Sequence, residues 1–418
     1  MKEHVINATK NPLIAGSFFL FSGGMLANIF NFLFNLLMSR NLEVSEYGTL
    51  TSLVSLITLL GIPAGAVTPT VVSIAGKYFA EANSTMLHAF YFKLFRPLLI
   101  AGISIFVIFL IFSKQTGDFF NLQNSLLISV VMFSVVLSYI TTLNNSFAQA
   151  KLAFRYLSFV NFSSSLFKVA LSFGLVMLGW GLYGALAGFL ISLLLPLIFG
   201  IVYLRKVIFF NTNDAPHISY RNLISVGVPS AITVFCLNAL ISNDILLVKY
   251  LFSPFETGQY AGLSLIGRVI FYISAPVGTV MFPVIISKIS KGEKYKSILY
   301  LSLGLVGLGS ALITTFYYLF PEFTVLFFLK REEYLTVTQY VGRFGIFITL
   351  YALLSILSYY FLSIKNTSFS WVLLCGTVFQ VILISLFHND FNQIINSSIV
   401  ICSFLLISAF YFFHKAKN

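Results

Sequence analysis

The chain has 418 residues, of which 58% are hydrophobic and 9% are charged, and its formal net charge is +12. Soluble domains carry charge on about a quarter of their residues, so this composition excludes an ordinary soluble domain and indicates a membrane protein. The backbone must close its hydrogen bonds inside lipid, and the sequence lacks the alternating pattern of barrel strands. We therefore expect transmembrane α-helices.

Twelve apolar runs are long enough to cross a bilayer, which takes about 20 residues. In chain order they are 13–38, 47–74, 94–113, 124–148, 156–178, 181–204, 222–248, 258–287, 297–320, 334–363, 368–388 and 395–413. Six runs precede the polar stretch 208–221 and six follow it. This predicts a six-helix N-terminal lobe at 1–207, a cytoplasmic linker at 208–221 and a six-helix C-terminal lobe at 222–418.

The second half of the chain repeats the first. The pairs at an offset of 213 are Tyr47 with Tyr260, Pro63 with Pro276, and Gly65 with Gly278; those at 209 are Asn35 with Asp244 and Arg40 with Lys249. Such an offset is about half the chain, so the repeats are whole lobes. Because six helices separate the copies, both enter the membrane in the same sense. We expect a pseudo-two-fold axis along the membrane normal, with a substrate path between the lobes.

The basic residues are distributed unevenly between the two predicted faces. Seventeen Lys and Arg residues fall on the face of the termini and even-numbered loops, and five on the other: Arg40, Lys114, Lys249, Lys330 and Arg331. This bias predicts that both termini are cytoplasmic. The positive net charge then reflects membrane topology, and we expect no nucleic-acid partner.

Three cations fall inside predicted spans: Lys168, Arg268 and Arg343. A cation at the bilayer centre costs about 2.5 kcal/mol or more, so such residues usually face a wet cavity or a partner. Lys168 is about 15 Å from either end of its predicted helix, beyond easy snorkelling. We expect all three to bind substrate. The alternatives are a lysine packed against backbone carbonyls, and partial snorkelling of the two arginines.

Asp244 is the acid that lies well inside a helix-forming run, near the outer end of the seventh predicted span. It is a candidate coupling residue that pairs with Arg268 or Lys249, or that takes up protons. The alternative is a residue at a helix end that meets solvent.

Polar stripes run along several predicted spans. They comprise Asn28, Asn31 and Asn35; Ser134, Ser138, Thr141 and Asn145; and Asn161, Ser164 and Ser172 beside Lys168. Each stripe lines a hydrated path or holds helices together by hydrogen bonds. Pro63 and Pro276 would kink the second and eighth spans at matching depth, which favours a gating role.

The residues at both repeats are similar to a known family. They are E-Y-G at Glu46–Gly48, G-Q-Y-A at Gly258–Ala261, F-P at Phe282–Pro283, and Asp244, Arg268 and Pro276. The whole chain resembles the lipid-linked oligosaccharide flippases of the multidrug/oligosaccharidyl-lipid/polysaccharide exporter superfamily. The resemblance implies two six-helix lobes in the bacterial inner membrane. It also implies the flipping of undecaprenyl-diphosphate-linked sugar units for O-antigen or capsule assembly, with polymerase machinery as a further partner.

Buried cations suit a diphosphate, and polar stripes suit sugar hydroxyls. No phosphate-binding glycine-rich loop is present, so we expect neither ATP as the direct energy source nor a cofactor, and coupling to H⁺ or Na⁺ stays open. A multidrug antiporter of the same superfamily is the first alternative. A glycan polymerase or ligase is the second, but the outer loops are short, and the histidines lack the spacing of a catalytic or metal site.

Overall fold

The computed structural model describes residues 12–65, 67–120, 122, 126–209, 221–290, 292–364 and 366–415. All regular structure within these residues is helical. Most of the predicted linker 208–221, and the residues at both termini, lie outside the described part of the chain. Their cytoplasmic location stays a prediction.

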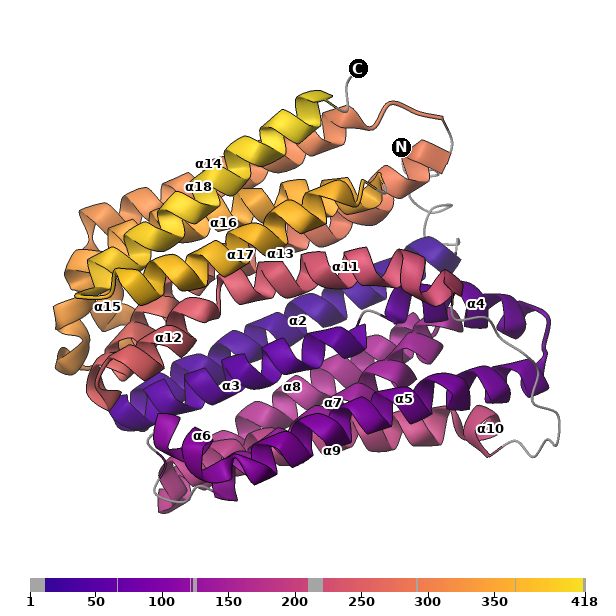
Figure 1. The fold of residues 1–418 in the computed structure, drawn as a ribbon, viewed down its shortest axis with the longest axis horizontal. Coiled ribbons are helices and arrows are strands. Elements are labelled where there is room, and N and C mark those ends of the chain that lie inside the picture. The colour runs from indigo at the N-terminus through magenta and orange to yellow at the C-terminus, as the bar shows by residue number, and fades with distance from the viewer. Residues whose placement is uncertain are drawn as a thin grey trace. The chain divides into compact units, whose positions relative to one another are not determined.

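Every predicted span is occupied by helix (Figure 1). The first six spans are α2 (Pro12–Asn41), α3 (Val44–Gly65) with α4 (Thr68–Ala80), α5 (Ser84–Ile111), α7 (Leu126–Ala150), α8 (Phe154–Leu175) and α9 (Gly181–Tyr203). The last six are α11 (Arg221–Leu240) with α12 (Asn243–Leu251), α13 (Pro254–Ser290), α14 (Lys296–Leu319), α16 (Thr338–Ser363), α17 (Ser368–Leu386) and α18 (Phe391–Lys415).

Within the described residues, nine helical stretches are long and apolar enough to cross a membrane, or ten if the bent pair of α11 and α12 counts as one span. One of the nine, Phe154–Tyr203, contains both α8 and α9. The 30-residue helix α2 lies at the first predicted span. The described helices therefore fit a twelve-helix layout, and the chain is a multi-pass membrane protein.

Several short helices were not predicted because they are too short to give a periodic pattern. They are α6 (Ser113–Phe119), the π-helical turn η1 (Val176–Trp180), α10 (Arg205–Ile208), α15 (Pro321–Leu329) and the 3₁₀ helix η2 (Glu332–Val337). The turn between α8 and α9 depends on Gly179 at φ 88° and Gly181 at φ 48°, a conformation that a side chain disfavours.

The chain divides into two compact units that do not follow the predicted lobe boundary. Unit 1 comprises Met1–Leu37 and Leu60–Ala231, and unit 2 comprises Met38–Leu59 and Ile232–Asn418. The end of α2 and the first two-thirds of α3 thus pack with the C-terminal helices. The predicted division at 208–221 rests on the sequence repeat and stays a prediction, whereas these units describe the packing.

In unit 1, α8 packs on α9, and α7 contacts α4, α5 and α9 (Figure 1). Helices α8 and α9 approach closely at Gly188, which has no side chain. A Cβ added there would lie 2.3 Å from the backbone nitrogen of Ser172. One apolar cluster of this unit joins α4, α5, α7 and α10 through Val71, Phe90, Phe147 and Val207.

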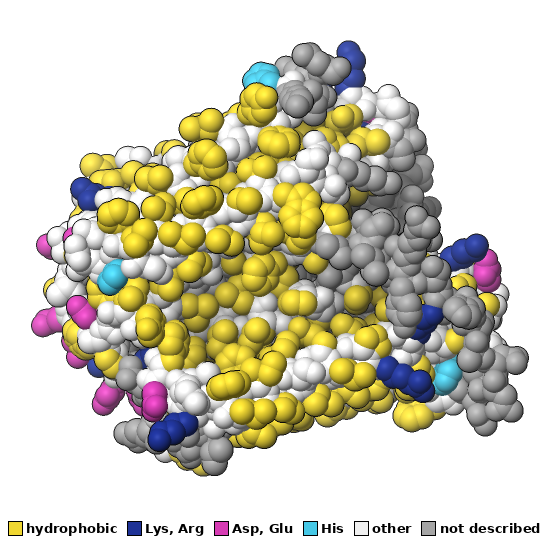
Figure 2. Space-filling view, viewed as in Figure 1, with side chains coloured by type: hydrophobic (Ala, Val, Ile, Leu, Met, Phe, Trp, Pro, Cys, Tyr) yellow, Lys and Arg dark blue, Asp and Glu magenta, His cyan; other side chains and the backbone are white. Residues whose placement is uncertain are grey.

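In unit 2, α16 is the central helix and contacts α13, α14 and α18. In the span Glu332–Ser363, which contains α16, 67% of the most apolar 18-residue segment is buried. This is the largest buried share among the spans of the described residues. Towards the outside of this unit, α14 and α18 expose Leu308, Leu312 and Ile407 by 70% or more. Figure 2 shows hydrophobic side chains along the helix flanks and charged ones near the helix ends, as expected for helices that contact lipid.

The predicted proline kinks differ between the two halves. Helix α3 ends at Gly65, two residues after Pro63, and α4 begins at Thr68. Helix α13, in contrast, continues for 37 residues through Pro276. The broken span of the second half is the seventh, where α11 and α12 meet at an angle of 46°.

The starts of α3 and α13 give a further pair for the repeat alignment. At the start of α3, the backbone nitrogen of Glu43 donates to Oε2 of Glu46 at 3.3 Å. At the start of α13, the backbone nitrogen of Ser253 donates to Oε2 of Glu256 at 3.0 Å, and Oγ of Ser253 accepts from the nitrogen of Glu256. These capping contacts align Glu46 with Glu256 at an offset of 210, which lies between the predicted offsets of 209 and 213.

Candidate functional site

Lys168 lies inside α8 in unit 1, and it is half-buried. Its Nζ donates a hydrogen bond to Oδ1 of Asn31 on α2. The ammonium also lies over two rings, 4.8 Å from the centroid of Phe34 and 5.8 Å from that of Phe189. No ion pair among the described residues involves Lys168. One amide oxygen and two π faces compensate this charge, which leaves ammonium hydrogens available to an anion.

The predicted asparagine stripe and the predicted lysine form one group in unit 1. Asn28, Asn31 and Asn35 are each half-buried on α2. Nδ2 of Asn35 donates to the backbone oxygen of Asn31 at 2.9 Å, while the side chain of Asn31 accepts from Lys168. A cation therefore lies beside amide groups that can also bind hydroxyls.

The serines beside Lys168 have a different role from the one predicted. Oγ of Ser164 donates to the backbone oxygen of Ser192 at 3.2 Å, and Oγ of Ser172 donates to that of Ala185 at 3.0 Å. Both acceptors belong to α9. These two serines hold α8 against α9, which is the alternative that the sequence left open.

Helix α7 carries buried polar atoms without a protein partner among the described residues. They are Oγ of Ser129, Oγ of Ser134, Oγ1 of Thr141, Nδ2 of Asn144 and Oδ1 of Asn145. An unpaired buried polar group costs about 1–3 kcal/mol. Water or a hydroxyl-bearing ligand would remove that cost, and the substrate-binding role of Asn145 stays a prediction.

Arg268 of α13 lies beside the break between α11 and α12. Its Nη2 donates to the backbone oxygen of Ile241 at 3.2 Å, and its buried Nε has no partner among the described residues. At the same break, Nε2 of Gln380 on α17 donates to the backbone oxygen of Leu240 at 2.9 Å. Two side chains thus satisfy carbonyls that the broken helix leaves free. Arg268 has a structural role that the sequence did not predict.

Asp244 is buried in the first turn of α12, with 1% of its surface exposed. Oδ2 accepts from the hydroxyl of Tyr260 at 3.0 Å, and Oδ1 accepts from the backbone nitrogen of Ile245 at 2.8 Å. The solvent-exposed alternative is therefore wrong. No ion pair within 4.0 Å joins Asp244 to a cation in the described chain, although the charge of Arg268 still attracts its carboxylate.

Arg343 lies on an exposed surface near the start of α16. Its Nη1 donates to Oδ1 of Asn392, in the first turn of α18, at 2.8 Å. This position is much nearer to a helix start than the sequence indicated, because α16 begins only at Thr338. The geometry favours the snorkelling alternative for Arg343.

Lys249 is a cation that the sequence assigned to an outer loop and the structure buries. It lies in α12 with 1% of its surface exposed, and its Nζ donates to Oγ1 of Thr49 on α3 at 2.9 Å. The signal that could have identified it is its apolar flank, Ile245–Val248, which continues the seventh span.

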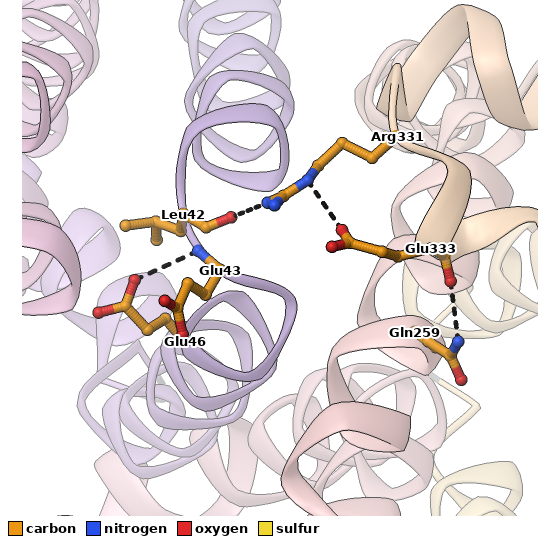
Figure 3. Close-up of polar contacts among 6 residues, drawn as sticks. All are labelled: Leu42, Glu43, Glu46, Gln259, Arg331 and Glu333. Carbon is orange, nitrogen blue, oxygen red and sulfur yellow. Dashed lines mark hydrogen bonds and ion pairs between the residues drawn. The ribbon is translucent and has the colours of Figure 1, made fainter.

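Two further cations at this end of unit 2 bind backbone carbonyls. Arg40 donates to the oxygens of Phe327 and Phe328, both at 2.7 Å. Arg331 donates to the backbone oxygen of Leu42 and forms an ion pair with Glu333 at 2.9 Å (Figure 3). These contacts join the end of α2 and the turn that follows it to the end of α15 and the residue before η2.

The site residues thus form separate groups. In unit 1, Lys168 is joined to the asparagines of α2, and Asn145 lies on α7. In unit 2, Arg268 and Asp244 lie near one another at the helix break, while Arg343 binds at the start of α18. Lys168 belongs to unit 1, whereas Arg268 and Arg343 belong to unit 2, and the joint cationic surface of the three residues stays a prediction.

The described residues form a helical membrane fold that fits twelve spans and carries cations within its helices. The model of the family described as "Polysaccharide biosynthesis protein" matches residues 13–290. The chain belongs to this family. No curated protein sequence matches the chain.

Solved structures of the same fold include a flippase and multidrug transporters. The lipid II flippase MurJ in an inward closed conformation has a TM-score of 0.71 at 14% identity, over 96% of this chain and 87% of that one. The MATE multidrug transporter DinF-BH has a TM-score of 0.70 at 13% identity, over 98% and 96%. An inward-facing MATE transporter of the MOP superfamily has a TM-score of 0.67 at 13% identity, over 94% and 95%.

Proposed function

We propose that this protein flips undecaprenyl-diphosphate-linked oligosaccharide repeat units from the cytoplasmic to the outer leaflet by alternating access. The product supplies surface polysaccharide assembly, such as that of O-antigen or capsule, and a polysaccharide polymerase acts next. The family supports a role in polysaccharide biosynthesis. The fold, which this chain has in common with a lipid II flippase, supports a lipid-linked substrate.

Lys168 is the observation that carries the proposal. Lys168 is a residue of the transmembrane helix α8, and its ammonium donates a hydrogen bond to Asn31. The ammonium has no carboxylate partner within the described chain. An anionic headgroup that crosses a low-dielectric region needs such a charge. The amides of Asn28, Asn35 and Asn145 suit sugar hydroxyls, because an amide both donates and accepts.

Arg268 and Arg343 are the further cations proposed to bind substrate. The buried Nε of Arg268 has no partner in the described chain, so it can donate to a phosphate oxygen while Nη2 holds Ile241. Arg343 is exposed near the start of α16, where its guanidinium can meet the headgroup at the membrane edge. Each cation would then serve a different stage of the headgroup's passage.

Asp244 is the proposed coupling residue for H⁺ or Na⁺. It is a buried carboxylate beside a broken helix, and in transporters such breaks coordinate coupling ions. Pro63 and Pro276 are proposed gating residues, and the break after Pro63 supports a hinge there. We place the protein in the bacterial cytoplasmic membrane with both termini cytoplasmic, on the charge bias.

A multidrug antiporter is the second candidate function, because this chain has the fold of MATE transporters. A cationic drug requires a negative site, and Asp244 supplies one. Its two oxygens already accept hydrogen bonds from Tyr260 and Ile245, however, and Arg268 adds positive charge nearby. The cation-lined arrangement favours an anionic substrate.

The test uses a bacterial strain in which this chain is the sole flippase for one surface polysaccharide. We expect that Lys168→Ala abolishes most surface glycan at normal protein abundance, and that Lys168→Arg retains part of it. Lys114→Ala is the matched control, because Lys114 is exposed on α6. Normal glycan in the Lys168→Ala strain, together with loss of cationic dye efflux in an Asp244→Asn strain, would favour the antiporter.

A further inference from the structure

Lys249 has fewer compensating contacts than any comparable cation at its end of unit 2. Its side chain is among the largest fully buried ones of the chain. An ammonium has three donor hydrogens, and the described contacts give it one acceptor, Oγ1 of Thr49. Thr49 in turn donates to the backbone oxygen of Ser45 at 3.0 Å. No carboxylate lies within 4.0 Å of this ammonium in the described residues.

Arg40 and Arg331 provide the contrast. Both are bound to backbone carbonyls at the same end, and Arg331 has a carboxylate partner as well. Those contacts are sufficient for a role in holding helices together. Lys249 lacks them, and a buried charge without compensation destabilises the state in which it is buried. A structural role would be met better by an apolar side chain of the same length.

A close helix crossing lies next to Thr49, the residue that accepts the hydrogen bond of the Lys249 ammonium. A Cβ added at Gly48 would lie 2.6 Å from the backbone nitrogen of Gly258, and one added at Gly258 would lie 1.8 Å from the backbone oxygen of Val44. The backbones of α3 and α13 therefore touch. The hydroxyl of Thr257, next to Gly258, reaches the backbone oxygen of Val248, beside Lys249.

The two glycines are also repeat equivalents. Gly48 and Gly258 differ by 210 residues, the offset that the capping contacts of Glu46 and Glu256 define. Equivalent residues in contact lie on a local two-fold axis. Neither glycine has a side chain beyond hydrogen, so the contact of Gly48 with Gly258 is backbone to backbone, and separating α3 from α13 breaks no side-chain packing between these two residues. Separation would take Thr49 away from Lys249 and leave the ammonium without a partner.

We propose that Lys249 is a substrate-binding cation that this structure masks: separation of α3 from α13 at the Gly48–Gly258 crossing frees its ammonium to bind the diphosphate of the lipid-linked substrate. This inference rests on the proposed flippase function. The charge bias assigns this end to the outer side, so Lys249 would act late, as the headgroup leaves the protein. Burial of the ammonium raises the free energy of the state in which α3 contacts α13. An anion that binds the freed ammonium would therefore favour separation of the two helices.

The test compares Lys249→Met, Lys249→Arg and Thr49→Val in the full-length protein. Lys249→Met removes the charge and keeps the length. We expect it to lower flipping of polyprenyl-diphosphate-linked oligosaccharide in proteoliposomes by about tenfold or more, because a hydrogen bond to a charged group contributes that much. We expect its melting temperature to stay the same or rise. Lys249→Arg and Thr49→Val should retain most flipping, since each keeps a cation.

Accessibility supplies a readout that a structural role would not change. Lys249→Cys, in a background with Cys236, Cys375 and Cys402 replaced by serine, should react slowly with a membrane-impermeant thiol reagent. Adding Gly258→Leu should speed the reaction, because the larger side chain holds α3 away from α13. Equal rates in the two proteins would overturn the proposed masking.

The outcomes separate this inference from the function on which it rests. Full flipping by Lys249→Met, with flipping lost in Lys168→Ala, would overturn the role of Lys249 and leave the flippase function intact. A lowered melting temperature in Lys249→Met would also overturn it, in favour of a structural role. The absence of any flipping by the unaltered protein would instead contradict the flippase function.

Discussion

The hydroxyl of Tyr260 donates a hydrogen bond to Oδ2 of Asp244 across 3.0 Å, and both side chains are at least 99% buried. The pair joins α13 to the first turn of α12, immediately after the break in the seventh span. A carboxylate at this position depends on few donors, so each one has a measurable effect on folding. The break itself is stabilised by side chains from α13 and α17.

Tyr260→Phe should therefore destabilise the protein by about 1.5–3 kcal/mol, the contribution of a hydrogen bond to a charged group. Thermal unfolding in detergent would measure the change. Tyr250→Phe is the control, because Tyr250 is 65% exposed and should change the melting temperature little. Equal effects of the two substitutions would show that the buried pair contributes nothing specific.

Gln380→Leu should destabilise the break between α11 and α12. The substitution removes the donor to the backbone oxygen of Leu240 and leaves that carbonyl buried without a partner, which costs about 1–3 kcal/mol. The amide also accepts from Asn243 at 3.2 Å and donates to Oγ of Ser398 at 3.1 Å, so three contacts are lost together. Hydrogen exchange in α12 should become faster than in α16. Unchanged protection of α12 would contradict a role of Gln380 in holding the break.

Arg268 should tolerate lysine better than alanine. Arg268→Lys keeps the charge and loses the planar group that binds Ile241 and a phosphate oxygen at once, so partial flipping is expected. Arg268→Ala should lose most flipping and also lower the melting temperature, because Arg268 caps a free carbonyl. If flipping and stability fell in equal proportion in both variants, Arg268 would be a structural residue alone.

Gly258→Ala should weaken the contact between α3 and α13. The added Cβ would lie 1.8 Å from the backbone oxygen of Val44, so the helices must shift, at a cost of about 1–3 kcal/mol. Gly304→Ala is the matched control, because no atom lies within 4 Å of its added Cβ. Alanine is also the better helix former, so the control should be neutral or more stable. The melting temperatures of the two variants provide the comparison.

Pro63 and Pro276 should differ in their effect on transport. The structure breaks the helix after Pro63 and continues it through Pro276, so Pro63→Ala should slow flipping more than Pro276→Ala. The double substitution should slow it further at normal abundance. An unchanged rate in the double variant would reduce both prolines to packing residues.

The length of apolar runs was sufficient to predict the fold. Twelve runs predicted twelve spans, and the observed helices fill each of them. Charge was a poorer guide to the site. The sequence identifies Lys168 because its helix is long and apolar on both sides, whereas it assigns Lys249 to an outer loop, although Lys249 is buried and binds Thr49, 200 residues away in the chain. A contact between residues 200 positions apart leaves no local pattern.

The structural role of Arg268 could not be predicted from a local sequence pattern either. Its partner is a carbonyl freed by a bend of 46° between α11 and α12, and no proline marks that bend. The helix starts add a pair that residue type alone does not reveal, because Glu46 and Glu256 have the same capping role at an offset of 210. Helix starts depend on side-chain contacts to the backbone, which a match of residue types does not show.

The most direct test of the account is flipping by the triple variant Lys168→Ala, Arg268→Ala, Arg343→Ala in proteoliposomes that contain polyprenyl-diphosphate-linked oligosaccharide. The fraction of glycan exposed on the outer leaflet is measured over time and normalised to reconstituted protein. The account predicts that the triple variant loses nearly all flipping, and that Lys168→Ala alone loses most of it. Full flipping by the triple variant at normal abundance would contradict the central claim that these cations carry the substrate diphosphate.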